Sequence, residues 1–296
     1  MTFRVTLPCT RAEAEALKGD IAPFAALDAP PTLVTSEAEG DAWRLDAYFE
    51  QAPTADDLAL LRTLAPSGRA KPEVEQLADA DWLTLSQAGL EPIRAGRFFV
   101  HTPAHRDAIP AGSIAFEIDA GRAFGTGQHE TTTGCLIALD RLKDAGAVFG
   151  QIADLGTGTG LLAFAGLRLW PSARAIASDI DPVAIEVAAE NAAINGVPIG
   201  RGPGQCELAV AAGLDHRRLI IRAPYDLIIA NILAGPLVEL AADIAGALAP
   251  RGRLILAGLL DWQAERVIAA YAPHGLRLLG RIDRSEWPTL VLRKRL

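Results

Sequence analysis

The feature that most constrains the fold is a repeated alternation of short apolar runs with amphipathic stretches, from about residue 150 to the C-terminus. Runs such as "QIADLG" and "RAIASDID" are each followed by a stretch whose apolar residues have helical spacing. Short apolar strands that alternate with helices form a parallel sheet covered on both faces. We therefore predict an α/β fold with a doubly wound sheet, in which ligands bind beyond the carboxyl ends of the strands.

The chain before this region predicts a smaller unit and a connector. In residues 1–80, strand-like runs alternate with two helical stretches capped by Thr10 and Thr54, which favours a small ferredoxin-like α+β domain. Residues 81–112 are rich in Pro, Gly and aromatic residues and predict an irregular connector that packs against one or both domains. The predicted larger domain is then 113–296.

Charge is distributed unevenly between these domains. The 296-residue chain has a net charge of −8, and residues 1–80 contain 7 Lys and Arg against 14 Asp and Glu. No basic patch is visible in the sequence, which disfavours direct nucleic-acid binding. The acidic first domain is either a solvated surface or a docking site for a basic partner, and charge alone leaves both readings open.

Two further patterns bear on location and on metal binding. No apolar run has the length of a membrane span, and the N-terminus lacks the apolar centre of a secretory signal. Cys9, Cys135 and Cys206 are far apart and lack CxxC spacing. They predict buried thiols in a reducing cytosol, with no disulfide framework and no metal site.

The stretch "ADLGTGTGLL" (153–162) leaves a predicted strand and opens a helix. Its glycines permit a tight turn and close contact with a ligand. A P-loop would need Lys after Gly160, and a dinucleotide site would need Gly where Leu161 stands. The pattern Asp-x-Gly-x-Gly-x-Gly instead resembles methyltransferases that use S-adenosylmethionine. A purely structural turn is the alternative.

Two acids follow the next predicted strand. Asp179 ends this strand, and a carboxylate at that place can accept hydrogen bonds from both ribose hydroxyls of an adenosyl group. Asp181 precedes Pro182, the arrangement of a helix N-cap followed by proline at the first helical position. We therefore predict that Asp179 binds ribose and that Asp181 is structural.

A single carboxamide, Asn231, ends the apolar run of "YDLIIANILAGPL" (225–237). In a doubly wound sheet this fourth strand lies beside the first, so the amide is expected near the glycine turn. A side-chain carbonyl there could accept an N–H from a substrate amine and direct the nitrogen lone pair at a methyl group. Burying it costs less than burying a carboxylate. The alternative is an Asn that caps the turn before Gly235-Pro236.

Longer strings carry a family resemblance. "ANILAGPL" resembles a variant of the Asn-Pro-Pro-Tyr motif found in the PrmA family, the methyltransferases of large-subunit ribosomal protein eleven. "AFGTGQHETTTGCLIALD" (123–140), "DLGTGTGLLAFA" (154–165) and "SDIDPVAIEVAAENAAINGV" (178–197) are also similar to that family. The resemblance implies a class I methyltransferase-like sheet, mostly parallel with the last strand antiparallel, and a substrate-recognition domain at the N-terminus.

The resemblance also implies an activity and a site. The activity is transfer of methyl groups from S-adenosylmethionine to lysine ε-amines and the N-terminal α-amine of the basic ribosomal protein. Asn231 matches the active-site asparagine, which contacts cofactor and substrate amine. The other matching cofactor-binding positions are Thr132, Gly156, Gly158 and Asp179. His129 lies in the same motif as Thr132, without a defined role, and "TTTG" could simply cap the helix that follows.

The chain departs from the family pattern in two places. Residues 198–224 are longer and richer in Gly and Arg than expected, which leaves one wall of the site undefined. The tyrosine of the wider motif is absent, so no aromatic clamp is expected. Methylation of a release-factor glutamine or of RNA is an alternative, which the missing Pro-Pro-Tyr and the absent basic face disfavour. A nucleotide-binding adaptor without catalysis is the alternative of a different class.

Overall fold

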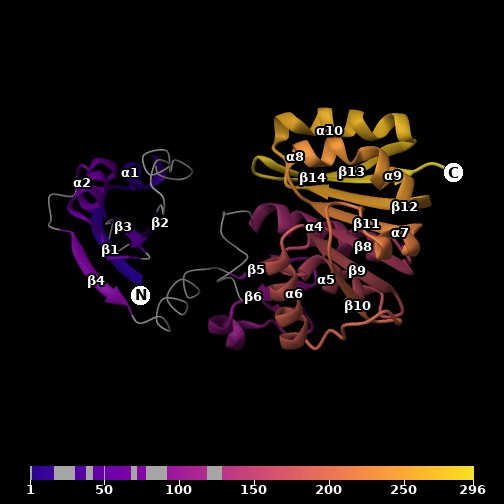
Figure 1. The fold of residues 1–296 in the computed structure, drawn as a ribbon, viewed down its shortest axis with the longest axis horizontal. Coiled ribbons are helices and arrows are strands. Elements are labelled where there is room, and N and C mark those ends of the chain that lie inside the picture. The colour runs from indigo at the N-terminus through magenta and orange to yellow at the C-terminus, as the bar shows by residue number, and fades with distance from the viewer. Residues whose placement is uncertain are drawn as a thin grey trace. The chain divides into compact units, whose positions relative to one another are not determined.

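The structure is a computed structural model that divides the chain into two compact units, residues 1–86 and 87–296 (Figure 1). Each unit is described by itself. The residues described are 2–16, 31–37, 43–49, 51–67, 72–77, 92–118 and 129–296.

The first unit contains a four-stranded antiparallel sheet with the strand order β2-β3-β1-β4. Its elements are β1 (Thr2–Cys9), α1 (Arg11–Ala16), β2 (Thr32–Glu37), β3 (Trp43–Phe49), α2 (Ala55–Leu64) and β4 (Glu73–Leu77). Apolar side chains that include Val5, Leu45 and Leu61 form its core. Every strand and helix expected in this region is therefore present, and the classification as ferredoxin-like stays a prediction.

Both helices of this unit begin at the predicted caps. The Thr54 hydroxyl accepts the backbone N–H of Asp57 at 3.2 Å, and the Asp57 carboxylate accepts the N–H of Thr54 at 2.8 Å. Thr10 and Glu13 form the same reciprocal pair. Such capping boxes satisfy two N–H groups that a helix start would otherwise leave free.

The second unit begins with a small sheet in the order β5-β6-β7. Its strands are β5 (Ile93–Ala95), β6 (Phe98–His101) and β7 (Ile114–Glu117), with the 3₁₀ helix η2 (Pro103–Ala108) between the last two. The prediction of an irregular connector is therefore wrong for 93–101. Phe98 is buried in the core of this unit and Phe99 is also buried, and strand pairing satisfies the backbone groups buried with them. Residues 81–91 lie outside the described part of the chain.

The main sheet has seven strands in the order β10-β9-β8-β11-β12-β14-β13. They are β8 (Gln151–Leu155), β9 (Arg174–Asp179), β10 (Cys206–Val210), β11 (Tyr225–Asn231), β12 (Leu248–Ala257), β13 (Leu276–Arg284) and β14 (Trp287–Lys294). The pairs from β10 to β12 are parallel, whereas β14 is antiparallel to both of its neighbours. The predicted doubly wound sheet with an antiparallel last strand is confirmed.

Helices cover both faces of this sheet (Figure 1). One face carries α4 (His129–Asp144), α5 (Leu161–Leu169) and α6 (Pro182–Ile194). The other carries α7 (Arg217–Arg222), α8 (Ala234–Glu239), α9 (Ala241–Ala247) and α10 (Ala264–Tyr271), with η3 (Asp261–Gln263) and η4 (Ala272–His274) flanking α10. Among the described residues, no helix combines the length and the apolar character needed to cross a membrane.

Strand β11 is buried on both sides. Leu227 and Ile229 belong to the core on the α4 face, and Ile228 and Ala230 belong to the core on the α8 face. Asn231 is the residue that follows this apolar run, at the carboxyl end of the strand. The sequence pattern therefore places one amide where the core opens toward the edge of the sheet.

Candidate functional site

Strand register brings three predicted site segments together. Strand β8 lies between β9 and β11, with Leu155 opposite Ser178 on one side and Ala230 on the other. The residues that follow these three positions are Gly156, Asp179 and Asn231. The glycine turn therefore starts between the predicted ribose acid and the predicted catalytic amide.

The turn has a backbone conformation that requires glycine. Gly156 and Gly160 have φ values of +69° and +84°. Residues that have a Cβ adopt such values only with steric strain. A Cβ added to Gly156 would lie 2.2 Å from Cγ2 of Ile232. The backbone N–H groups of Gly156 and Thr157 both donate to the carbonyl of Ser178, at 2.8 and 2.9 Å. The turn is thus held against β9 and leaves no room for a side chain at its first position.

Asp179 is oriented by the turn. Its Oδ2 accepts the backbone N–H of Gly158 at 2.9 Å, and its Oδ1 accepts the N–H of Asp181 at 3.1 Å. A carboxylate oxygen has two lone pairs, so each oxygen can accept a further hydrogen bond from a ligand. The side chain of Asp181 accepts the N–H of Val183 at 2.8 Å and caps α6, as predicted.

A second acid, Asp154, lies buried behind the turn. Its Oδ2 accepts the hydroxyl of Thr157 at 2.6 Å and the N–H of Ala163 at 3.1 Å, which ties the turn to α5. Its Oδ1 is buried without a hydrogen-bond partner among the described residues. Burial raises the pKa of Asp154 to about 6. Sequence reasoning assigned this residue no role, although it opens the glycine motif.

A cavity of about 440 Å³ lies beyond the carboxyl ends of β8, β9 and β10. Among the described residues its wall has two carboxylates and neither Lys nor Arg, so it suits a ligand that carries positive charge. One wall comes from residues 198–224, the segment whose place in the site the sequence left undefined. The small residues that this segment contributes have no pattern from which a role in the site could be predicted. The lining residues are Leu155, Gly156, Asp179, Ile180, Ala211, Ala212, Gly213, Ile232, Pro236, Glu239 and Leu240.

Asn231 and Thr132 meet beside this cavity. The Asn231 amide Nδ2 donates to the hydroxyl of Thr132 across 3.4 Å, so β11 and α4 are joined at this point. Asn231 Oδ1 is buried and has no hydrogen-bond partner among the described residues. Neither side chain lines the cavity, whereas the next residue, Ile232, does. The structure thus gathers Gly156 and Asp179 around the cavity and pairs Asn231 with Thr132 next to it.

The prediction that "TTTG" caps a helix is wrong. Helix α4 already begins at His129, so Thr132 lies inside its first turns. The three threonines are buried, and their packing in the core outweighs the modest helix propensity of threonine. Residues 123–128 of this motif and the side chain of His129 lie outside the part of the structure that is described.

Known proteins resemble this chain over most of its length. A family model described as ribosomal protein L11 methyltransferase (PrmA) matches residues 23–295. A protein named ribosomal protein L11 methyltransferase from Caulobacter sp. (strain K31) is 43% identical over 287 residues, which cover 96% of this chain and 95% of that protein. One of the same name from Brucella melitensis biotype 2 is 42% identical over 264 residues, 89% of each chain.

A solved structure shares the fold. The crystal structure of ribosomal protein L11 methylase from Lactobacillus delbrueckii subsp. bulgaricus superposes with a TM-score of 0.59 at 25% identity. The match covers 70% of this chain and 99% of that one.

Proposed function

Because this chain belongs to the ribosomal protein L11 methyltransferase (PrmA) family, we propose that it transfers methyl groups from S-adenosylmethionine to ribosomal protein L11. The match confirms the resemblance predicted from the motifs, and the fold and enzyme class that this resemblance implied. The residues that carry the reaction are part of the proposal.

The cavity at the glycine turn fits S-adenosylmethionine. Its volume of about 440 Å³ lies in the range of small-molecule sites. In our proposal the free lone pairs of Asp179 accept the ribose hydroxyls, and the exposed side chain of Ile180 packs on the adenine. Gly156 and Gly158 let the cofactor approach the backbone. Bound there, the cofactor supplies an electrophilic methyl group beside a wall whose described residues include two carboxylates and no Lys or Arg.

The observation that carries the proposed chemistry is the Oδ1 of Asn231, which has no hydrogen-bond partner in the described part of the chain. A buried carbonyl without a hydrogen bond is costly, which supports its use by a bound substrate. We propose that this oxygen accepts an N–H of the incoming neutral amine and so directs the nitrogen lone pair toward the cofactor cavity. The Thr132 hydroxyl accepts the N–H of Nδ2 at the other end of the amide, which leaves Oδ1 for the substrate. The proton released from nitrogen passes to water.

The finer part of the proposal concerns the substrate amines. We propose that lysine ε-amines and the N-terminal α-amine of L11 are methylated, and that residues 1–80 dock this basic protein. The excess of 14 acidic over 7 basic residues in that segment favours encounter with a positively charged partner. We place the reaction in the cytoplasm, where thiols stay reduced, because Cys9, Cys135 and Cys206 are all free.

Mass spectrometry of purified L11 incubated with the enzyme and S-adenosylmethionine tests this function. The expected result is a set of peptides from L11 whose masses increase by whole methyl groups, at lysines and at the N-terminus. Parallel reactions contain a release factor or ribosomal RNA in place of L11. Methylation of one of these, with none on L11, would replace the proposed substrate by that alternative.

A further inference from the structure

A second cleft lies at the opposite end of the same strands. It has a volume of about 360 Å³ and is lined by Gln151, Arg174, Arg201, Glu207, Arg218, Ile221 and Arg222. Arg174 begins β9 and Asp179 ends it. At about 3.3 Å per residue, roughly 17 Å of strand separates this cleft from the cofactor cavity. The cleft is therefore a separate site.

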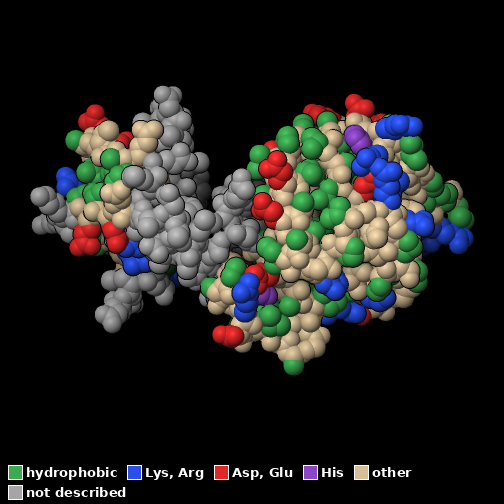
Figure 2. Space-filling model, turned by 60° about the horizontal axis from the view of Figure 1, so that its bottom comes forward, with side chains coloured by type: hydrophobic (Ala, Val, Ile, Leu, Met, Phe, Trp, Pro, Cys, Tyr) green, Lys and Arg blue, Asp and Glu red, His purple; other side chains and the backbone are tan. Residues whose placement is uncertain are grey.

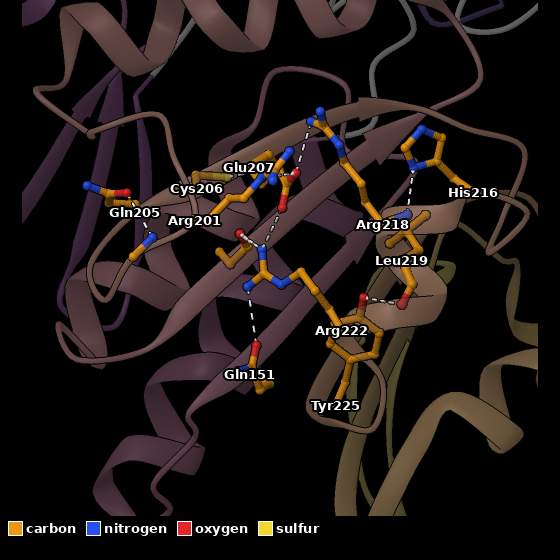
Figure 3. Close-up of polar contacts among 12 residues, drawn as sticks. Gln151, Arg201, Gln205, Cys206, Glu207, His216, Arg218, Leu219, Arg222 and Tyr225 are labelled. Carbon is orange, nitrogen blue, oxygen red and sulfur yellow. Dashed lines mark hydrogen bonds and ion pairs between the residues drawn. The ribbon is translucent and has the colours of Figure 1, made fainter.

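The cleft is organised around one buried carboxylate, that of Glu207 on the edge strand β10 (Figure 3). Only 4% of Glu207 is exposed. Its Oε1 accepts Nε of Arg201 at 3.0 Å and pairs with Nη1 of Arg218 at 2.9 Å. Nη1 of Arg222 approaches the other oxygen at 3.4 Å. Three guanidinium groups thus converge on a single negative charge.

Arg222 is held independently of this carboxylate. Its Nη1 donates to the carbonyl of Ala175 at 2.9 Å, and its Nη2 donates to the side chain of Gln151 at 3.2 Å (Figure 3). Only 12% of its side chain is exposed. This guanidinium is a fixed part of the cleft wall, and it stays in place whether or not the more exposed arginines move.

Most N–H donors of Arg201 and Arg218 have no hydrogen-bond partner among the described residues. A guanidinium has five N–H donors in a planar fork. Within the described part of the chain, Arg201 uses its Nε and Arg218 uses its Nη1. Arg174 lines the same cleft, and its side chain has no hydrogen-bond or ion-pair partner among the described residues. The cleft therefore offers several N–H groups that no acceptor among the described residues satisfies.

The charges of the cleft do not balance. Four arginines and one glutamate line it, which leaves three positive charges in excess. Residues 81–296 as a whole nearly balance, with 21 basic and 22 acidic residues, so this excess is local. Figure 2 shows Lys and Arg side chains at several separate places on the visible face of the second unit. A concave surface with such a charge concentrates anions.

From this geometry we propose that the cleft binds a phosphate oxyanion, free or as part of a phosphate ester. Guanidinium forks match the oxygens of phosphate and form paired hydrogen bonds with them. Glu207 orients Arg201 and Arg218 at the rim, Arg222 forms the wall, and Arg174 supplies a free fork. The bound oxyanion neutralises part of the positive charge of the four arginines that Glu207 alone does not balance.

Titration calorimetry with inorganic phosphate, at constant ionic strength set with chloride, tests the site. We expect saturable binding at millimolar phosphate, and at least about fivefold weaker binding by Arg174→Gln, the loss of one charge-assisted hydrogen bond. Arg174→Gln removes no hydrogen bond or ion pair among the described residues. The matched control is Arg266→Gln, an exposed arginine on α10 outside the cleft. Affinity for S-adenosylmethionine should be equal in all three proteins.

Two results would overturn the site: no phosphate binding by the wild-type protein, or equal weakening by Arg174→Gln and Arg266→Gln. A second arm replaces phosphate by a short single-stranded RNA. RNA binding that is weakened by Arg174→Gln and displaced by phosphate identifies a phosphodiester as the ligand. RNA binding that is indifferent to Arg174→Gln, together with phosphate binding that depends on it, identifies the free or monoester anion.

Discussion

The carboxylates at the two ends of strands β8, β9 and β10 have opposite kinds of partner. At the carboxyl end, Asp154 and Asp179 accept hydrogen bonds from backbone N–H groups and a hydroxyl, and the described residues that line the neighbouring cavity include no Lys or Arg. At the amino end, Glu207 is surrounded by arginines. A parallel sheet gathers equivalent strand ends at one edge, so the two edges of one sheet can have opposite charge. The carboxyl edge suits a cationic cofactor, and the amino edge suits an anion.

The partners of each carboxylate also determine how the removal of its charge changes the stability of the protein. Neutral donors compensate only part of the cost of burying a charge, and burial therefore raises the pKa of Asp154. Guanidinium groups compensate charge directly, but they in turn depend on the carboxylate that they face. The predictions below test this contrast.

The largest effect is expected at the amino end, for Glu207→Gln. Removing one partner of a buried ion pair destabilises proteins by about 3–5 kcal/mol when the charge left behind is itself buried, as that of Arg222 is. We expect a loss of this size in the free energy of unfolding measured with denaturant. Glu265→Gln, on the exposed face of α10, is the matched control and should change stability by less than about 0.5 kcal/mol. Similar stability for the two variants would show that Glu207 is not a structural charge.

The effect of phosphate on the stability of Glu207→Gln and of the wild-type protein is a second test at the amino end. A ligand that binds only the folded protein raises its stability by an amount that grows with the logarithm of one plus the ratio of the ligand concentration to its Kd. If the cleft binds phosphate, adding it should recover more stability in Glu207→Gln than in the wild-type protein, because the variant has the larger positive excess. Equal shifts in both proteins would contradict the view that Glu207 offsets part of the positive charge of the cleft.

At the carboxyl end, the pH dependence of stability should depend on Asp154. Its pKa in the folded protein is raised from 3.8 to about 6, so the fold favours the protonated acid. The contribution of this raised pKa to the free energy of unfolding is fully present below about pH 4 and is lost as the pH rises through about 6. The shift corresponds to about 3 kcal/mol. Relative to Asp154→Asn, the wild-type unit should lose about this much unfolding free energy between those pH values. Parallel stability curves would show that the buried acid does not titrate there.

A smaller effect is expected for Asp179→Asn, measured as affinity for S-adenosylmethionine. A hydrogen bond to a charged group contributes about 1.5–3 kcal/mol, which corresponds to a loss of about 10- to 100-fold. Asp181→Asn is the control, since asparagine also caps helices, and it should leave cofactor affinity unchanged. Equal losses in the two variants would indicate damage to the start of α6 and not a lost ribose contact.

Much of the methyltransferase unit could be predicted because its signals are local. Alternating apolar runs fix β8 to β11, and the positive φ of Gly156 and Gly160 corresponds to the spacing of the glycine motif. The proximity of Asn231 to the turn followed from strand order alone. These features require only periodicity and parallel topology.

What could not be predicted depends on packing between distant segments. The strands at 93–101 form because Phe98 and Phe99 become buried, which their irregular surroundings in the sequence conceal. The start of α4 upstream of Thr132 reflects burial that outweighs local capping signals. The arginine cleft joins Gln151, Arg174 and Glu207 through sheet order, and no motif connects them in sequence.

The central claim is that the carboxamide of Asn231 positions the substrate amine, and the rate of methyl transfer in a single turnover tests it directly. With L11 and saturating S-adenosylmethionine, Asn231→Ala should transfer methyl groups about 100-fold more slowly, because misplacing a reacting group has effects of this size. Its dissociation constant for the cofactor should stay within about threefold of the wild-type value, less than the loss of one ordinary hydrogen bond. A rate near that of the wild-type enzyme, or equal losses of rate and cofactor affinity, would contradict the claim.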